Sequence, residues 1–218
     1  MRFGSNESST TTLKPILNQL HLSEARSEAI YLAVPVTGGI RLWEVAARHH
    51  LAEINRVRTA FPEEFERLVL RPNFQAAEKL TLLARKRFPR KIIVNPSLVH
   101  VPGWSQQKYR RAWKVFISRF VKMILAATGW QFSYGCVEEV THALEHDIPV
   151  IDESGQTISV ASAYRSVASA RTTSIAMGLR VQFLTGFLRK LEQHTNVKET
   201  KGCRNAGFRS KCLKADST

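Results

Sequence analysis

Four short apolar segments, separated by stretches of helical periodicity, dominate the pattern of this chain. They cover residues 29–36, 91–95, 121–127 and 147–152. The first ends at Thr37-Gly38-Gly39, and the second is closed by Pro96. Short apolar runs of this kind are typical of parallel strands that are buried on both faces. The sequence therefore predicts a parallel sheet of four strands.

Between these segments, apolar residues recur at three- and four-residue intervals, which predicts helices. The predicted helices cover residues 42–58, 63–68, 74–88, 106–119 and 138–146, followed by closing helices over 159–170 and 173–193. Alternating strands and helices indicate an α/β fold. We expect a three-layer, flavodoxin- or Rossmann-like parallel sheet with helices on both faces, plus C-terminal helices.

The chain has 218 residues and reads as a single α/β domain with appendages. Residues 1–27 are interpreted as a leader that is disordered over its Ser/Thr-rich first twelve residues and carries a short helix near 15–20. Residues 28–193 form the α/β domain, and 194–218 are predicted to be a basic, flexible tail. No apolar run reaches the ~18 residues of a membrane span. Three widely spaced cysteines suit a reducing compartment, so we expect a cytoplasmic protein.

The net charge of +14 is distributed unevenly. Between Lys79 and Val137 there is no Asp or Glu, although this stretch carries twelve Lys and Arg residues. Such a field attracts anions, so a nucleotide or another phosphorylated small molecule is the expected partner. A basic face that only keeps the protein soluble, and a nucleic-acid contact made by this stretch and the tail, are the alternatives.

The segment from Gly129 to Glu139 lies between a predicted strand and a predicted helix. In open α/β sheets, ligands bind outside the carboxyl ends of the strands, where backbone N–H groups at helix N-termini attract anions. We expect Glu139 in the first helical turn, facing this crevice. At that position the helix dipole would favour the ionised carboxylate.

The order of these motifs resembles the nucleoside 2-deoxyribosyltransferase-like superfamily, and most nearly its nucleoside 5'-monophosphate N-glycosidase branch. The resemblance covers roughly residues 29–152. It rests on the segment from Tyr31 to Gly39 and on the segment from Ser133 to Glu139, in the expected order of strands and helices. The branch that hydrolyses monophosphates has serine where Ser133 stands, whereas the nucleoside transferases have aspartate there.

The resemblance implies an N-glycosidase or deoxyribosyltransferase-like enzyme without a cofactor, commonly a homodimer. It implies that Glu139 is the nucleophile and that Tyr31 belongs to the active site. The residues implied in binding the substrate or its phosphate are Thr37, Gly38, Gly39, Ser133, Gly135 and Trp130. A carboxylate suits this chemistry because the glycosidic bond breaks through a state with positive charge at the anomeric carbon.

One expected group is missing from the chain. The family supplies a proton to the leaving base from an aspartate before the third strand, but residues 106–127 contain no acid. Asp152, Glu153 and Glu138 remain as alternative donors, or the base leaves with little help. A further alternative is a nucleotide-binding or sensing module of the same fold that catalyses nothing.

Each proposed site residue also has a structural interpretation. Glu139 could be an ordinary acid near a helix start, and Ser133 and the glycines could serve only the turns. Tyr31 and Trp130 could be core residues. The pairs His49–His50 and His142–His146 lack a third ligand at metal spacing in the sequence, so we expect no metal site.

Overall fold

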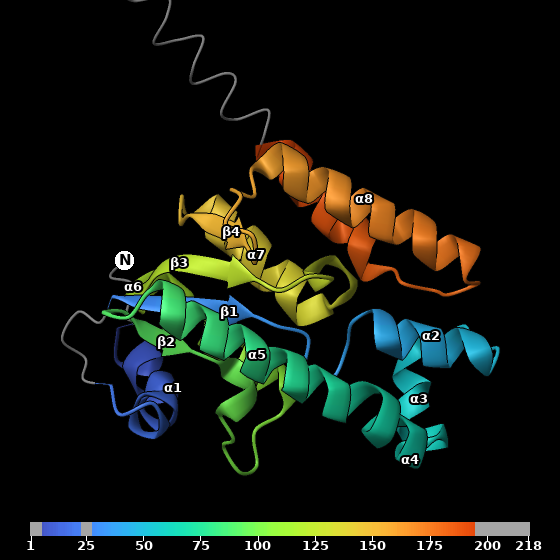
Figure 1. Cartoon of the computed structure of the whole chain (residues 1–218), viewed down its shortest axis with the longest axis horizontal. Helices are drawn as coiled ribbons and strands as arrows, with labels where there is room; N and C mark the ends of the chain where they lie inside the picture. Colours follow the sequence, from blue (N-terminus) through green and yellow to red (C-terminus); the bar gives the residue numbers. More distant parts are fainter. Residues whose placement is uncertain (1–5, 23–27, 195–218) are drawn as a thin grey trace, which may run out of the picture.

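The computed structural model of the chain describes residues 6–22 and 28–194. In this part, four strands form a parallel sheet in the order β2-β1-β3-β4 (Figure 1). The strands are β1 (Ala29–Ala33), β2 (Ile92–Val94), β3 (Val121–Ala126) and β4 (Val150–Asp152). Each lies within a predicted apolar segment, so the predicted α/β fold with a four-stranded parallel sheet is confirmed. The tail from residue 195 onward lies outside the described residues.

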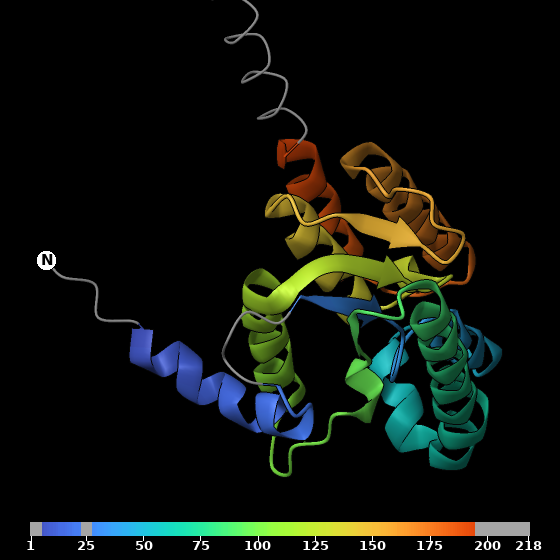
Figure 2. The same cartoon turned by 60° about the vertical axis from the view of Figure 1, so that its left-hand side comes forward.

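Alternate residues of β1 divide the core between the two faces of the sheet. Ile30, Leu32 and Val34 face the long helix α5 (Arg71–Arg87) and pack with its buried residues Ala77, Leu80 and Ala84. Tyr31 and its neighbours Ala29 and Ala33 belong to the larger cluster, which includes α6 (Gln106–Phe120) and α7 (Tyr134–Glu145). Figure 2 shows α5 and α6 on opposite sides of the sheet. The helices on both faces make the three predicted layers.

Helix α6 shows how the sequence specifies these elements. Ser105 caps its N-terminus by accepting a hydrogen bond from the Lys108 backbone N–H at 3.3 Å. The buried residues then recur at helical spacing along one face: Ala112, Trp113, Phe116, Ile117 and Phe120. This stripe fills the space under β1 and β3, and it places Trp113 beside Tyr31.

Several helix boundaries differ from the prediction in the segment before β2. The helix predicted over 42–58 is divided into α2 (Ile40–Arg48), the 3-10 turn η1 (Ile54–Arg56) and α3 (Val57–Ala60). The chain leaves α2 at His50, whose φ is 53°. The predicted helices 63–68 and 74–88 instead follow one another without a break as α4 (Pro62–Glu64), the π-helical segment η2 (Phe65–Leu70) and α5. Pro72 does not interrupt this rod because it lies in the first turn of α5, next to the wide π turn.

The helices near the two ends of the described chain also differ from the predicted ones. Helix α1 runs from Asn6 to Gln19, so much of the segment expected to be disordered is helical. Its residues Leu13, Ile16 and Leu17 are buried in the larger core cluster, which anchors α1 against α6. After β4, helix α8 (Val160–Ala176) is followed by a further helix over residues 183–194. These two helices break at Gly178, with φ of 69°, rather than near residue 171. No helix in the described ranges is long and apolar enough to span a bilayer.

Candidate active site

The carboxyl ends of β1 and β3 lie side by side, and the chain leaves them in opposite directions across the sheet. From β1 it crosses through α5 to β2 on one side, and from β3 it crosses through α7 to β4 on the other. This is the point at which open α/β sheets form a ligand-binding crevice. The loop after β1 contains Gly38, and the loop after β3 contains Ser133. A Cβ placed on Gly38 would lie 3.3 Å from the Ser133 Oγ, so the two loops meet at this edge.

The two residues implied in catalysis are hydrogen-bonded to each other, although 108 positions separate them. The Tyr31 hydroxyl donates to Glu139 Oε1 at 2.7 Å. Tyr31 is fully buried, and its ring meets that of Trp113 edge-on at 5.4 Å between centroids. Glu139 is only partly exposed. The pair therefore lies between the central strand and α7, on the face of the sheet covered by α6 and α7.

The environment of Glu139 raises its pKa to about 8. Burial, which penalises the charged carboxylate, is the main cause. The Tyr31 hydrogen bond acts in the opposite direction, and the nearby Glu138 carboxylate adds to the increase. Because Glu139 is partly exposed, the effect of burial on its pKa is an upper bound. With a pKa of about 8, Glu139 is protonated at neutral pH in the free protein.

Two expectations about Glu139 are therefore wrong. Helix α7 begins at Tyr134, four residues before the predicted start, so Glu139 stands in the second turn and not the first. The helix dipole acts mainly on the first turn. At this depth in the fold, desolvation outweighs the dipole, and the carboxyl is not held ionised as we expected.

The beginning of α7 is built from Ser133, Gly135 and Cys136. Ser133 is the N-cap residue and is buried, but its side chain makes no capping hydrogen bond to the helix backbone. Its hydroxyl is hydrogen-bonded to the Cys136 thiol, whose pKa is raised chiefly by burial. Gly135 lies inside the first helical turn, so the turn predicted at this residue is absent. The first N–H groups of α7 have no partner within the helix. The loop that carries Gly38 approaches this helix start at Ser133.

The loop after β1 has a shape that only glycine permits. Gly39 is the N-cap of α2 with φ of 91°, and a Cβ on it would lie 3.0 Å from Pro35 Cβ. Thr37 and Gly38 are partly exposed at the tip of this loop. Trp130, from the 3-10 turn η4 (Trp130–Phe132), is only 5% exposed, which favours a packing role over stacking on a base.

Asn73 is a site residue that the sequence interpretation missed. It is buried on α5, and its Nδ2 donates to the carbonyl oxygens of Val36 and Gly38, each at 2.9 Å. Its Oδ1 accepts from the Arg41 guanidinium at 2.9 Å. One amide thus holds the loop after β1 in place. The sequence did contain a signal for Asn73. It is a polar residue four positions from each of the apolar residues Val69 and Ala77, which places it on the buried face of the helix.

Each of the three alternative proton donors already has a hydrogen-bonding or ionic partner. Glu138 forms an ion pair with Lys114 at 3.2 Å. The Asp152 carboxylate accepts from the Ser154 hydroxyl and from the Gln156 N–H, and the Ser154 bond is the main reason that its pKa is lowered. Glu153 accepts from the Thr128 N–H at 2.7 Å. The missing family aspartate has no evident replacement among these residues.

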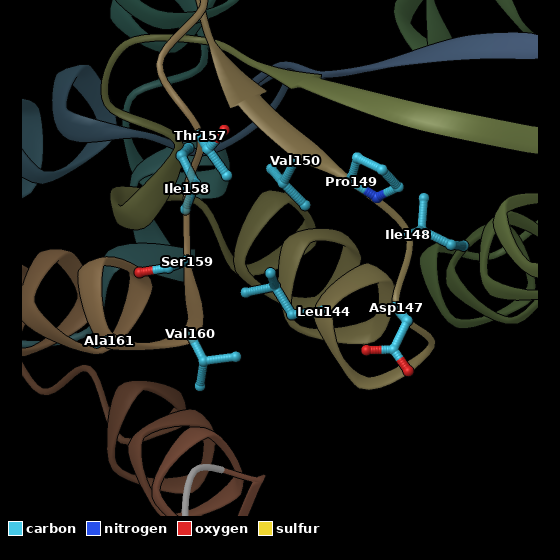
Figure 3. A pocket seen from close by; sticks show the side chains of 10 residues that line it. All are labelled: Leu144, Asp147, Ile148, Pro149, Val150, Thr157, Ile158, Ser159, Val160 and Ala161. Carbon is cyan, nitrogen blue, oxygen red and sulfur yellow. The ribbon is translucent and has the colours of Figure 1, made fainter. Parts of the chain in front are cut away.

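A cavity of about 450 Å³ lies elsewhere, between the end of α7, β4 and the beginning of α8 (Figure 3). Its walls are mostly apolar, with Leu144, Val150, Ile158 and Val160 around the opening in the close-up. None of the predicted site residues lines it. Its lining carries no cluster of groups suited to the chemistry considered above.

Comparisons with known proteins found no protein-family model, curated protein or solved structure that matches this chain. The residues and their geometry therefore carry the functional argument.

Proposed function

We propose that this protein cleaves the N-glycosidic bond of a nucleoside 5'-monophosphate, either as a hydrolase or as a glycosyltransferase. The hydrogen bond of 2.7 Å between the Tyr31 hydroxyl and Glu139 Oε1 carries the proposal. It joins the two residues implied in catalysis, which lie between β1 and α7, and α7 begins in the loop that leaves the carboxyl end of β3.

In this mechanism, the ionised Glu139 carboxylate attacks the anomeric carbon as the bond to the base breaks. The bonding electrons leave with the base, and a covalent glycosyl ester forms on Glu139. Water, or a second base in a transferase, then attacks the same carbon and releases the carboxylate. Tyr31 holds one carboxylate oxygen by its hydrogen bond, which leaves the other oxygen directed at the sugar.

The phosphate would occupy the junction of the two loops. Gly38 and Gly39 offer close backbone approach, the first N–H groups of α7 offer donors, and Ser133 offers a hydroxyl. A basic side chain also reaches this helix start, because the Arg110 guanidinium lies 4.5 Å from the centre of the Tyr134 ring. The acid-free stretch that contains Arg110 then contributes a favourable field for the anionic substrate.

The pKa of Glu139 sets the expected pH dependence. A nucleophile must be ionised, so the rate should rise with pH until about pH 8 and then level off. Because Glu138, Asp152 and Glu153 are engaged elsewhere, the leaving base receives little assistance from protein acids. Nucleotides whose bases leave more easily should therefore react faster.

The test is a panel of ribo- and deoxyribonucleoside monophosphates incubated with the full chain, with free base measured by chromatography. Glu139→Gln preserves the shape of the side chain and should abolish base release. Glu138→Gln is the matched control, since it removes a neighbouring carboxylate paired with Lys114, and it should retain activity. Unchanged turnover in Glu139→Gln would exclude the nucleophile and with it the mechanism.

A second candidate function is a nucleotide-binding module without catalysis. The protonated state of Glu139 at neutral pH and the absence of a free proton donor among the three alternatives favour it. Calorimetry would then show nucleotide binding that survives in Glu139→Gln, while no free base appears at any pH between 6 and 9. Sedimentation of the same samples tests the homodimer, which stays a proposal from the resemblance.

A further inference from the structure

A cluster of potential metal ligands lies on α7, one turn beyond Glu139. His142, Glu145 and His146 occupy positions i, i+3 and i+4, which share one face of a helix. One ligand atom from each residue lies within 4.8 Å of those of the other two. His142 is partly exposed, and Glu145 and His146 are exposed, so an ion has access to all three. The sequence interpretation overlooked Glu145 as the third ligand of this histidine pair.

Hydrogen bonds orient both imidazoles. His142 Nε2 lies 3.1 Å from the Lys114 carbonyl oxygen and 2.7 Å from the Ser118 Oγ, both on α6. His146 Nδ1 lies 2.8 Å from the His142 carbonyl oxygen. A carbonyl oxygen can only accept a hydrogen bond. In each neutral imidazole, the proton is therefore on the ring nitrogen that faces the carbonyl oxygen. The lone pairs are therefore on His142 Nδ1 and His146 Nε2.

This arrangement is the one that metal-binding histidines use. A histidine ligand generally donates its second ring N–H to a carbonyl or carboxylate, which fixes the ring and its tautomer. Here both rings have such a partner before any ion binds.

The charges around the cluster leave it accessible to a cation. Lys114 and Lys190 lie near His142, and their positive charges oppose a cation. Lys114 forms an ion pair with Glu138 at 3.2 Å, and the Glu138 carboxylate offsets the positive charge of Lys114. The Glu145 carboxylate supplies a negative charge within the ligand set itself.

We propose that His142, Glu145 and His146 form a binding site for a divalent transition-metal ion, with Zn²⁺ as its expected occupant. Imidazole nitrogens suit zinc, copper and nickel, and two histidines with one carboxylate are a ligand set known for zinc with a water in the fourth position. The His-x-x-Glu-His spacing on one helix also occurs in zinc enzymes, where the two histidines bind the ion. The role of Glu145 as a ligand here rests on its position beside the two rings. The site is separate from the glycosidic proposal and stands without it.

The experiment titrates Zn²⁺ into the chelator-treated full chain by calorimetry, with Co²⁺ absorption as a second readout. One ion should bind, and His146→Ala, an exposed change, should weaken binding by about 100-fold or more, since even second-shell losses cost 10–100-fold. Glu145→Gln tests the carboxylate in the same way. His50→Ala, at an unrelated histidine, is the matched control and should bind as the unaltered chain does.

Three results would overturn the proposal. The first is no Zn²⁺ binding by the unaltered chain. The second is an affinity in His146→Ala, and in the double variant His142→Ala/His146→Ala, that equals that of the unaltered chain. The third is a thiolate-to-cobalt charge-transfer band, which would assign the ion to cysteines. Far-UV circular dichroism of the metal-free variants verifies that a lost affinity does not reflect a lost fold.

Discussion

Replacing Glu139 by Gln should stabilise the folded protein, and increasingly so as the pH rises. The carboxyl has an ordinary pKa of 4.5 when the chain is unfolded and a pKa of about 8 in the folded protein. Between these values the unfolded chain binds fewer protons than the folded one, so stability falls with rising pH. Gln stays neutral at every pH, and its Oε1 can still accept the Tyr31 hydrogen bond.

The magnitude follows from the two pKa values. Each tenfold change in the ionisation constant is worth about 1.4 kcal/mol. Relative to Glu139→Gln, the free energy of unfolding of the unaltered chain is therefore lower by about 1 kcal/mol at pH 5, about 3 kcal/mol at pH 7 and about 5 kcal/mol above pH 8. Because Glu139 keeps some contact with solvent, these values are upper bounds. Even half of this penalty is a large share of the stability of a typical domain.

The assay is urea unfolding of the unaltered chain and of Glu139→Gln at pH 5, 6, 7, 8 and 9. Other titrating groups contribute equally to both proteins, so they cancel in the difference between the two free energies of unfolding. That difference should grow steadily from pH 5 to pH 8 and then become constant. A difference that is independent of pH over this range would refute the raised pKa of Glu139.

Three further changes test the surroundings of the site. Tyr31→Phe removes the hydrogen bond that opposes the effect of burial, so the pKa of Glu139 should rise further above 8, as measured by carboxyl ¹³C NMR titration. Asn73→Ala leaves the Val36 and Gly38 carbonyl oxygens without their donor and should cost about 2–4 kcal/mol in urea unfolding. Gly39→Ala places a side chain on a residue with positive φ beside Pro35, so it should lower the free energy of unfolding by about 1–3 kcal/mol. Gly135→Ala adds a methyl group inside a helix with open space around it, so it should leave the stability unchanged or raise it. Thermal denaturation measures both variants.

The strands could be predicted from the sequence because each lies within a short apolar run, although only the central β1 is buried along its whole length. Helix boundaries were harder, since they depend on tertiary contacts. Helix α1 extends through a Ser/Thr-rich segment of weak intrinsic preference because Leu13, Ile16 and Leu17 find a place in the core. The early start of α7 at Tyr134 was likewise hidden, because glycine at position 135 is usually a turn signal.

At the candidate site, the sequence proposed which residues take part but not their electrostatics. The meeting of Tyr31 and Glu139 could be anticipated only through the resemblance, because nothing local in the sequence relates positions so far apart. The ionisation of Glu139 depends on how much protein surrounds it, and no periodicity reports that quantity. Asn73 was missed for a similar reason, since its partners are backbone carbonyls in a distant loop.

The π-helical segment η2 makes the rod from Pro62 to Arg87 sensitive to its length. Successive residues of an α-helix are rotated by about 100°, so deleting one residue from 65–70 would turn the outer end of the rod by that angle relative to α5. Phe65 and Val69 are buried on one side of this segment, while Asn73 must still reach the loop after β1. Both requirements cannot be met after such a deletion. Natural variants of this chain should therefore exchange exposed side chains here freely while conserving the residue count.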